Sequence, residues 1–137
     1  MKKVYLLFLI AVSCTQIVSK QNDGNDIKVA NKYVNEFYNQ IIENDSIALY
    51  NSLDKSISVD EFRDFLESKK DSFGNIVKVE ILNTKTFRVT KNNETNLNFS
   101  VELEVMYEGV TCNELVVFTG ENDESLFLDK YLVNEIK

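Results

Sequence analysis

The chain has 137 residues and a formal charge of −7, and 44% of its residues are hydrophobic. This length suits a single domain with its own core, and the acidic surface excludes a protein that attracts nucleic acid. The sequence contains no His. Because His is the commonest general base and metal ligand, its absence counts against hydrolase triads and zinc sites and leaves carboxylate chemistry open. We predict no catalytic residue, no metal site and no cofactor.

The first residues are organised like a secretory signal. Lys2 and Lys3 precede a run of nine apolar residues, Val4–Val12, which is too short for a membrane-spanning helix of about 20 residues. Ser13, a small residue, then precedes Cys14. This junction resembles the lipobox of bacterial lipoproteins, in which the cysteine is acylated, although Ala11 stands where that motif usually has Leu.

The resemblance implies that residues 1–13 are a signal peptide and that Cys14 is the site of lipid attachment. The protein would then be anchored in the bacterial cell envelope, outside the cytoplasm. Cleavage of an ordinary signal after Ser13 is the alternative, and it would give a secreted soluble protein. Residues 14–25 are polar and include Gly24, so we expect a flexible tether there and a single domain over residues 26–137.

Helical periodicity dominates the first half of this domain. An amphipathic helix is predicted with Asp26 as its N-cap. Its apolar positions recur at i, i+3 and i+4 spacing, namely Ala30, Tyr33, Val34, Phe37, Tyr38, Ile41 and Ile42. A short helix capped by Asp45 or Ser46 is expected next, followed by a third helix that begins with the capping box of Ser58 and Glu61.

The third helix is expected to end at Gly74, with Phe62, Phe65, Leu66 and Lys69 near one face. From Asn75 the apolar period changes to two, which predicts strands. We expect a first strand with a bend or a bulge at Asn83–Thr86, a turn at Asn92-Asn93, a central strand Leu97–Tyr107, a return strand Val110–Thr119 and a last strand Ser125–Ile136.

The central hairpin makes a specific prediction about Glu114. A two-residue turn at Glu108-Gly109 places Leu103 opposite Glu114 on the apolar face, where burial raises the pKa of an unpaired carboxyl group. A five-residue loop over Gly120–Glu124 then sets Lys130 opposite Glu114. We therefore predict a Glu114–Lys130 pair, which either orients a ligand or is a purely structural ion pair.

Helices followed by a meander of strands predict an α+β domain, with N-terminal helices packed on a curved antiparallel sheet. This order resembles the nuclear-transport-factor-2-like superfamily, whose cone-shaped domains share the cystatin-like layout, and small bacterial lipoproteins within it. The resemblance covers about Asp26–Ile136 and implies a pocket between the first helix and the sheet. The candidate pocket residues are Tyr33, Phe37, Leu103, Glu114 and Lys130.

We expect a non-catalytic module that binds a small ligand or a peptide. One alternative is an inhibitor or immunity-type protein that binds a basic partner through Glu102, Glu104 and Glu108 on an acidic sheet face. The other is an enzyme that uses a pocket carboxylate. Cys112 is expected to be a buried apolar side chain, and the alternative is a redox role or an intermolecular disulfide. The oligomeric state is left open.

Overall fold

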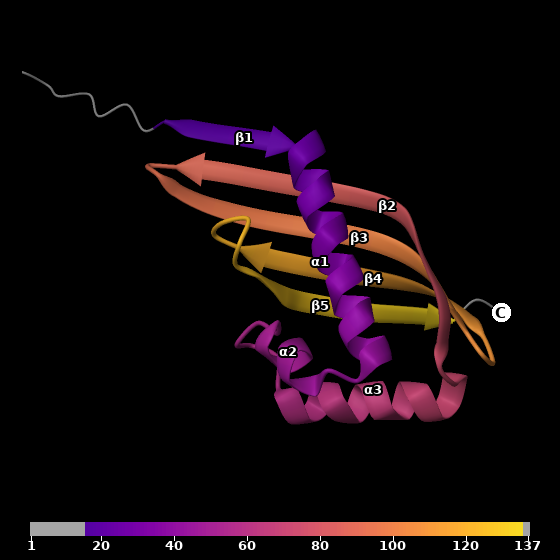
Figure 1. Cartoon of the computed structure of the whole chain (residues 1–137). Coiled ribbons are helices and arrows are strands. Elements are labelled where there is room, and N and C mark those ends of the chain that lie inside the picture. Colours follow the sequence, from indigo (N-terminus) through magenta and orange to yellow (C-terminus); the bar gives the residue numbers. More distant parts are fainter. Residues whose placement is uncertain (1–15, 136–137) are drawn as a thin grey trace, which may run out of the picture.

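A computed structural model describes residues 16–135 (Figure 1). The predicted signal peptide, Cys14 and the predicted last strand residue Ile136 lie outside this range. The described chain has an α+β fold, with the elements β1 (Ile17–Gln21), α1 (Gly24–Glu43), α2 (Ser46–Asn51), α3 (Val59–Phe73), β2 (Ile76–Lys91), β3 (Glu94–Tyr107), β4 (Thr111–Gly120) and β5 (Leu126–Glu135). The strands form one antiparallel sheet in chain order, from β1 to β5.

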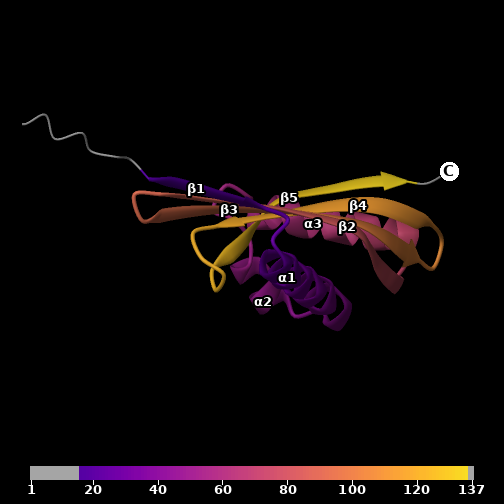
Figure 2. The ribbon, with the colours of Figure 1, turned by 90° about the horizontal axis from the view of Figure 1, so that it is seen from above.

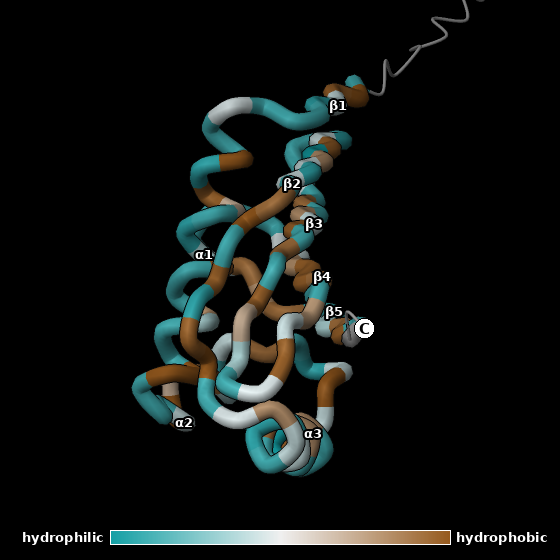
Figure 3. The backbone as a smooth tube through the Cα atoms, turned by 90° about the vertical axis from the view of Figure 1, so that its right-hand side faces the viewer, coloured by the Kyte–Doolittle hydropathy of each residue, from teal (hydrophilic) through white to brown (hydrophobic). Residues whose placement is uncertain are grey.

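Helices α1 and α2 lie on one side of this sheet (Figure 2). Helix α1 runs across the strands, and α3 lies beyond β5 at the lower edge of the sheet (Figures 1 and 3). Seen from above, no described helix covers the opposite face (Figure 2). The inward side chains of β3 and the apolar stripe of α1 belong to one hydrophobic core, which includes Val34, Phe37, Phe99, Val101 and Leu103.

The helix ends follow the side chains that satisfy their backbone groups. Asp23, and not the predicted Asp26, caps α1 by accepting a hydrogen bond from the backbone N–H of Asn25 at 3.0 Å. Asn44 ends α1 in the left-handed region at φ 56°, and Asp45 caps α2 as predicted. At α3, Ser58 Oγ accepts from the N–H of Glu61 at 3.4 Å.

The prediction of a flexible tether over residues 14–25 is wrong from Ile17 onward. Strand β1 pairs with the end of β2, from Ile17 opposite Lys91 to Gln21 opposite Phe87. The next residue is also fixed, because the N–H of Asn22 donates to the carbonyl oxygen of Thr86 at 2.9 Å. All five residues of β1 are exposed, so the strand lacks the apolar alternation that marks a half-buried strand.

The two hairpins around β3 agree with the sequence. Asn92 and Asn93 form the predicted turn with φ of 50° and 67°. The register of β3 and β4 is confirmed, with Leu103 opposite Glu114. Strand β2 is unbroken, and a register shift between Ile81 and Asn83 favours the bulge over the bend, at the start of the expected segment.

The predicted pairing of Glu114 with Lys130 is wrong. The β4–β5 turn sets Gly120 opposite Leu126, and a further shift lies between Val117 and Phe118. Val133 therefore faces Glu114, and Val117 faces Lys130. Because a slip of one residue moves side chains to the other face of a sheet, the shift leaves Lys130 exposed on the outer face.

The connector between α2 and α3 joins the edge of the sheet at β5. Leu53 forms a parallel bridge with Leu128. Two backbone hydrogen bonds hold it, from the N–H of Asp54 to the carbonyl of Leu128 at 2.8 Å and from the N–H of Leu128 to the carbonyl of Ser52 at 2.7 Å. This bridge brings the helices to the side of the sheet on which Glu114 lies.

Candidate functional site

The candidate site is a cleft of about 330 Å³ where α1, α2 and α3 meet the start of β2 and the end of β3. Apolar side chains, among them Ile41, Ile42 and Leu66, form part of its wall. Its polar residues include Arg63, Glu67 and Lys70 from α3, together with Lys69 and Tyr107, which reach the core. The cleft therefore combines an apolar wall with a few placed polar groups, as small-molecule sites do.

The floor of the cleft is tied to a buried carboxylate. Five residues form what we call the Glu114 cluster: Glu114, Lys69, Tyr38, Tyr107 and Tyr131. Oε1 of Glu114 accepts from Lys69 Nζ at 3.2 Å and from the Tyr107 hydroxyl. Oε2 accepts from the hydroxyls of Tyr38 and Tyr131, each at 2.5 Å. Four donors thus satisfy one carboxylate whose side chain is 0% exposed.

Lys69 is the cation that balances Glu114. Its side chain is 5% exposed, and its ammonium group also donates to the Tyr131 hydroxyl. The ammonium lies 4.4 Å from the ring centroid of Tyr131 and 5.1 Å from that of Tyr107. Ring faces attract such a cation, so both tyrosine rings hold Lys69, and the Tyr131 hydroxyl also accepts a hydrogen bond from it.

Burial controls the ionisation of these groups. It lowers the pKa of Lys69 from the usual lysine value, and the negative charge of Glu114 offsets part of that effect. Burial also raises the pKa values of Tyr38, Tyr107 and Tyr131, and the charge of Glu114 raises them further. The three phenols therefore stay protonated and continue to donate to the carboxylate at neutral pH.

The local sequence places each member of the cluster. Glu114 points inward because the two-residue hairpin sets it opposite Leu103. Tyr107 lies on the same face of β3 as Leu103, four positions away, and Tyr38 belongs to the apolar stripe of α1. Lys69 is two helical turns after Phe62 on α3, so the two share one face of that helix.

None of the predicted pocket residues lines the cleft, and of them only Glu114 contacts residues that do, namely Lys69 and Tyr107. Phe37 and Leu103 are packed in the hydrophobic core, so side chains occupy the predicted space between α1 and the sheet. Tyr33 is half-buried and donates to the carbonyl oxygen of Asp123 at 3.1 Å. Lys130 lies on the outer face of the sheet.

Sequence reasoning missed Lys69, Tyr38, Tyr107 and Tyr131 as functional residues. The signal for Lys69 was its position on the apolar face of a helix, where a lysine requires a buried partner. The sequence predicts Tyr38 and Tyr107 as ordinary core residues, because each belongs to an apolar pattern, the stripe of α1 and the inward face of β3. Their hydroxyl groups needed an acceptor inside the core, and Glu114 is that acceptor.

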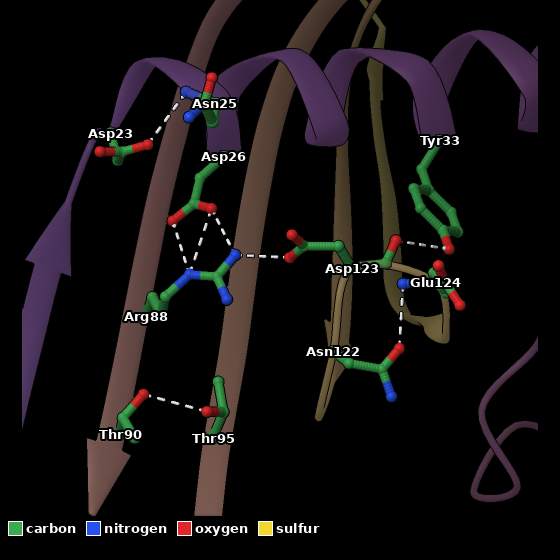
Figure 4. Close-up of polar contacts among 10 residues, drawn as sticks. All are labelled: Asp23, Asn25, Asp26, Tyr33, Arg88, Thr90, Thr95, Asn122, Asp123 and Glu124. Carbon is green, nitrogen blue, oxygen red and sulfur yellow. Dashed lines mark hydrogen bonds and ion pairs between the residues drawn. The ribbon is translucent and has the colours of Figure 1, made fainter. Parts of the chain in front are cut away.

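A second polar group of residues lies near the start of α1. Arg88 on β2 contacts Asp26 of α1 and Asp123 of the β4–β5 loop, each with a shortest distance of 2.5 Å (Figure 4). We call these three residues the Arg88 cluster. The Arg88 side chain is 22% exposed and that of Asp123 is 50% exposed. This cluster clamps a loop to a helix at the surface, and it lines neither the cleft nor the core around Glu114.

The predicted acidic face is electrostatically mixed. Glu102 lies 3.4 Å from Lys85, and Glu80 lies 2.8 Å from Lys78 on the neighbouring strand. Glu108 lies beyond the end of β3 and accepts from the backbone N–H of Asn75 at 2.8 Å. Lysines therefore accompany Glu80 and Glu102 on the outer face. Cys112 is fully buried in the core, which fits its predicted packing role.

Within residues 16–135, no three side chains of the metal-binding types gather in one place. Across the same residues, no helix is both long enough and apolar enough to cross a membrane. No protein-family model, curated protein or solved structure matches the chain. The interpretation of the cleft therefore depends on its own geometry.

Proposed function

We propose that the chain is a bacterial envelope lipoprotein, anchored through Cys14, whose domain binds a small ligand or a short peptide in the cleft. The observation that carries the binding role is the cleft of about 330 Å³ with Lys69 and Tyr107 at its inner end. Its volume lies in the range of ligand pockets, about 300–1,000 Å³.

Preorganisation supports this role. Lys69 and Tyr107 are the two residues that both line the cleft and belong to the Glu114 cluster. Their hydrogen bonds to Glu114 fix their side chains before any ligand arrives. A ligand that contacts them therefore loses less free energy in ordering the site than it would with mobile side chains.

The alternative of a carboxylate-using enzyme has little support in this geometry. Glu114 is the one carboxylate of the cluster, and its side chain is 0% exposed with both oxygens occupied by donors. A general base must reach the proton that it removes, within about 2.6–3.2 Å. The inhibitor alternative is also less supported, because lysines accompany the glutamates of the outer face.

We also propose membership of the nuclear-transport-factor-2-like superfamily. Helices on one face of a five-stranded antiparallel meander support this assignment. The resemblance places a pocket between α1 and the sheet, where core side chains now pack, and the cleft lies instead where α1, α2 and α3 meet the start of β2 and the end of β3. An experimentally solved structure that superimposed on no member of the superfamily over the sheet and α1 would refute it.

A thermal-shift screen of the full chain against metabolites and short peptides tests the binding role. Ile42 lines the cleft and is 51% exposed, whereas Ile47 is 78% exposed and lies outside the cleft. We expect a ligand at one hundred times its Kd to stabilise the wild type by about 2.7 kcal/mol. Ile47→Trp should keep this shift and Ile42→Trp should lose it, because the larger side chain fills the cleft.

An equal ligand shift in both variants would place binding elsewhere, and no ligand across the library would count against the role itself. The anchor needs a separate measurement. Intact-mass spectrometry of the membrane fraction should show an acylated Cys14, and an unmodified soluble protein would refute the anchor.

A further inference from the structure

We propose that β1 is a membrane-docking strand, in which Ile17 and Val18 enter the headgroup region of a phospholipid bilayer and the cleft faces away from it. This inference rests on the proposed acylation of Cys14. It concerns a surface that the binding role does not use, because neither residue lines the cleft.

Cys14 lies close to β1 in the sequence. Only Thr15 and Gln16 separate Cys14 from Ile17. Three Cα steps span at most about 11 Å, even when the chain is fully extended. The headgroup layer on each side of a bilayer is about 5–8 Å thick. An acylated Cys14 therefore keeps the start of β1 inside this layer or directly outside it.

Strand β1 is fixed to the rest of the domain. Its five residues pair with β2, and the next residue is held by two hydrogen bonds, from the N–H of Asn22 to the Thr86 carbonyl and from the N–H of Thr86 to Oδ1 of Asn22. The strand is consequently a rigid edge of the sheet and no spacer between the anchor and the domain. When the anchor approaches the bilayer, the β1 edge of the sheet approaches with it.

The β1 edge of the sheet exposes apolar side chains. Ile17 is 62% exposed and Val18 is 54% exposed, although both are β-branched aliphatic residues. Successive residues of a strand point to opposite faces, so the two present apolar surface on both sides of the edge. Apolar surface of this kind partitions into the boundary between headgroups and acyl chains. The net charge of −7 favours zwitterionic over anionic lipid.

The fold then sets the orientation. Figure 1 shows β1 at one end of the sheet, whereas α2 and α3 lie beyond the opposite edge, after β5. The cleft is built largely from α2, α3 and the C-terminal turn of α1. With β1 at the membrane, the cleft opens into the aqueous compartment, where a soluble ligand can reach it.

The sequence contains no Trp, so a single introduced Trp reports its own surroundings. The test uses the full acylated chain with Val18→Trp, reconstituted into phosphatidylcholine vesicles whose acyl chains are brominated near the headgroup. The matched control is Ile47→Trp, another exposed β-branched residue at the cleft end. Val18→Trp should lose about half its emission to bromine, since an interfacial side chain is buried about 5–10 Å. Ile47→Trp should keep its emission.

Equal emission from both variants while the protein stays bound to vesicles would overturn the docking strand and leave the lipid anchor intact. A chain without acylation that stays in solution would overturn both proposals. Shielding of Val18→Trp in the absence of lipid, together with a dimer in sedimentation, would overturn docking in favour of strand pairing between two copies.

Discussion

The Glu114 cluster and the Arg88 cluster both link the sheet to a helix through charged side chains. Each joins strands to a helix through a carboxylate and a cation. They differ in their access to water, because the Lys69 and Glu114 side chains are 5% and 0% exposed, whereas in the Arg88 cluster only Asp26 is buried, at 4%, and Arg88 and Asp123 are 22% and 50% exposed. In the first cluster every partner is required, while in the second cluster water can replace one.

The comparison separates two kinds of polar contact. A buried charge that loses its partner is not solvated by water, so the free energy of unfolding typically falls by about 3–5 kcal/mol. When a charged side chain at the surface loses its partner, water solvates it instead, so the free energy of unfolding changes little. The Glu114 cluster can therefore hold Lys69 and Tyr107 rigidly at the cleft, and the Arg88 cluster can only limit the movement of a loop.

Glu114→Ala is expected to have the largest effect. It leaves the Lys69 ammonium and three phenols without their acceptor, so the free energy of unfolding should fall by about 3–5 kcal/mol. Urea denaturation followed by circular dichroism measures this. The matched change in the other cluster is Asp26→Ala, which should cost about 1.5–3 kcal/mol because Arg88 keeps Asp123 and partial solvation. Equal losses for the two variants would contradict the distinction.

Alkaline pH should destabilise the protein through the Glu114 cluster. The pKa values of Tyr38, Tyr107 and Tyr131 are raised, so above about pH 10 the unfolded chain releases protons that the folded protein keeps. The stability that they contribute is full below this pH and is lost as the pH rises. Lys69 opposes this only up to about pH 10.4, the ordinary lysine value, because its pKa is lowered and the folded protein releases that proton first. Above that pH the three phenols set the slope, and the loss should be at most about 4 kcal/mol per pH unit.

Urea midpoints at a series of pH values between 8 and 11 test this prediction. Tyr107→Phe removes one of the three phenols, so it should reduce the slope by about 1.4 kcal/mol per pH unit. A flat profile up to pH 11 would show that the tyrosines ionise equally in the folded and unfolded chains. The Arg88 cluster should contribute nothing here, since the pKa of Arg88 is raised further above this range by Asp26.

A double substitution measures how strongly the two buried charges depend on each other. Lys69→Met and Glu114→Leu each leave one buried charge uncompensated. In the double variant no charge remains, so it should be more stable than Glu114→Leu alone by about 1–2 kcal/mol. Costs that simply add would mean that Lys69 and Glu114 stabilise the fold independently.

Asp123→Ala should have the smallest effect. Asp123 is half exposed, so the loss should be about 0–1 kcal/mol and should shrink further in high salt. The loop also keeps the bond from Tyr33, which goes to the Asp123 carbonyl oxygen and not to its carboxylate. Hydrogen exchange of residues 121–125 at two salt concentrations is the measurement. A loss above 2 kcal/mol would place Asp123 with the buried class.

Local patterns predicted the parts of the fold that depend on local forces. The apolar stripe of α1, the turn at Asn92-Asn93 and the register that buries Glu114 all follow from periodicity and turn chemistry. The partner of Glu114 did not follow, because a one-residue shift after Val117 turned Lys130 outward. Sequence spacing shows no such shift when both neighbouring residues are apolar.

The cleft itself could not be predicted, because its wall comes from segments far apart in the chain, such as Ile41, Leu66 and Ile76. Their approach depends on how α3 packs, and α3 is placed through Lys69 and the bridge of Leu53 with Leu128. Strand β1 was missed for a different reason. Its side chains are exposed, so only its backbone bonds identify it as a strand.

The position of β1 in the chain has a consequence for the order of folding. Strands β2, β3 and β4 each pair with the next strand across a short turn, whereas β1 pairs with β2 across all three helices, with Ile17 opposite Lys91. The entropy lost in closing a loop grows with its length, so this contact is the most costly to form early. In a chain synthesised from its N-terminus, β1 emerges first and remains unpaired until β2 has been synthesised. We therefore expect β1 to join the sheet last during folding and to be the first strand to leave when the protein unfolds.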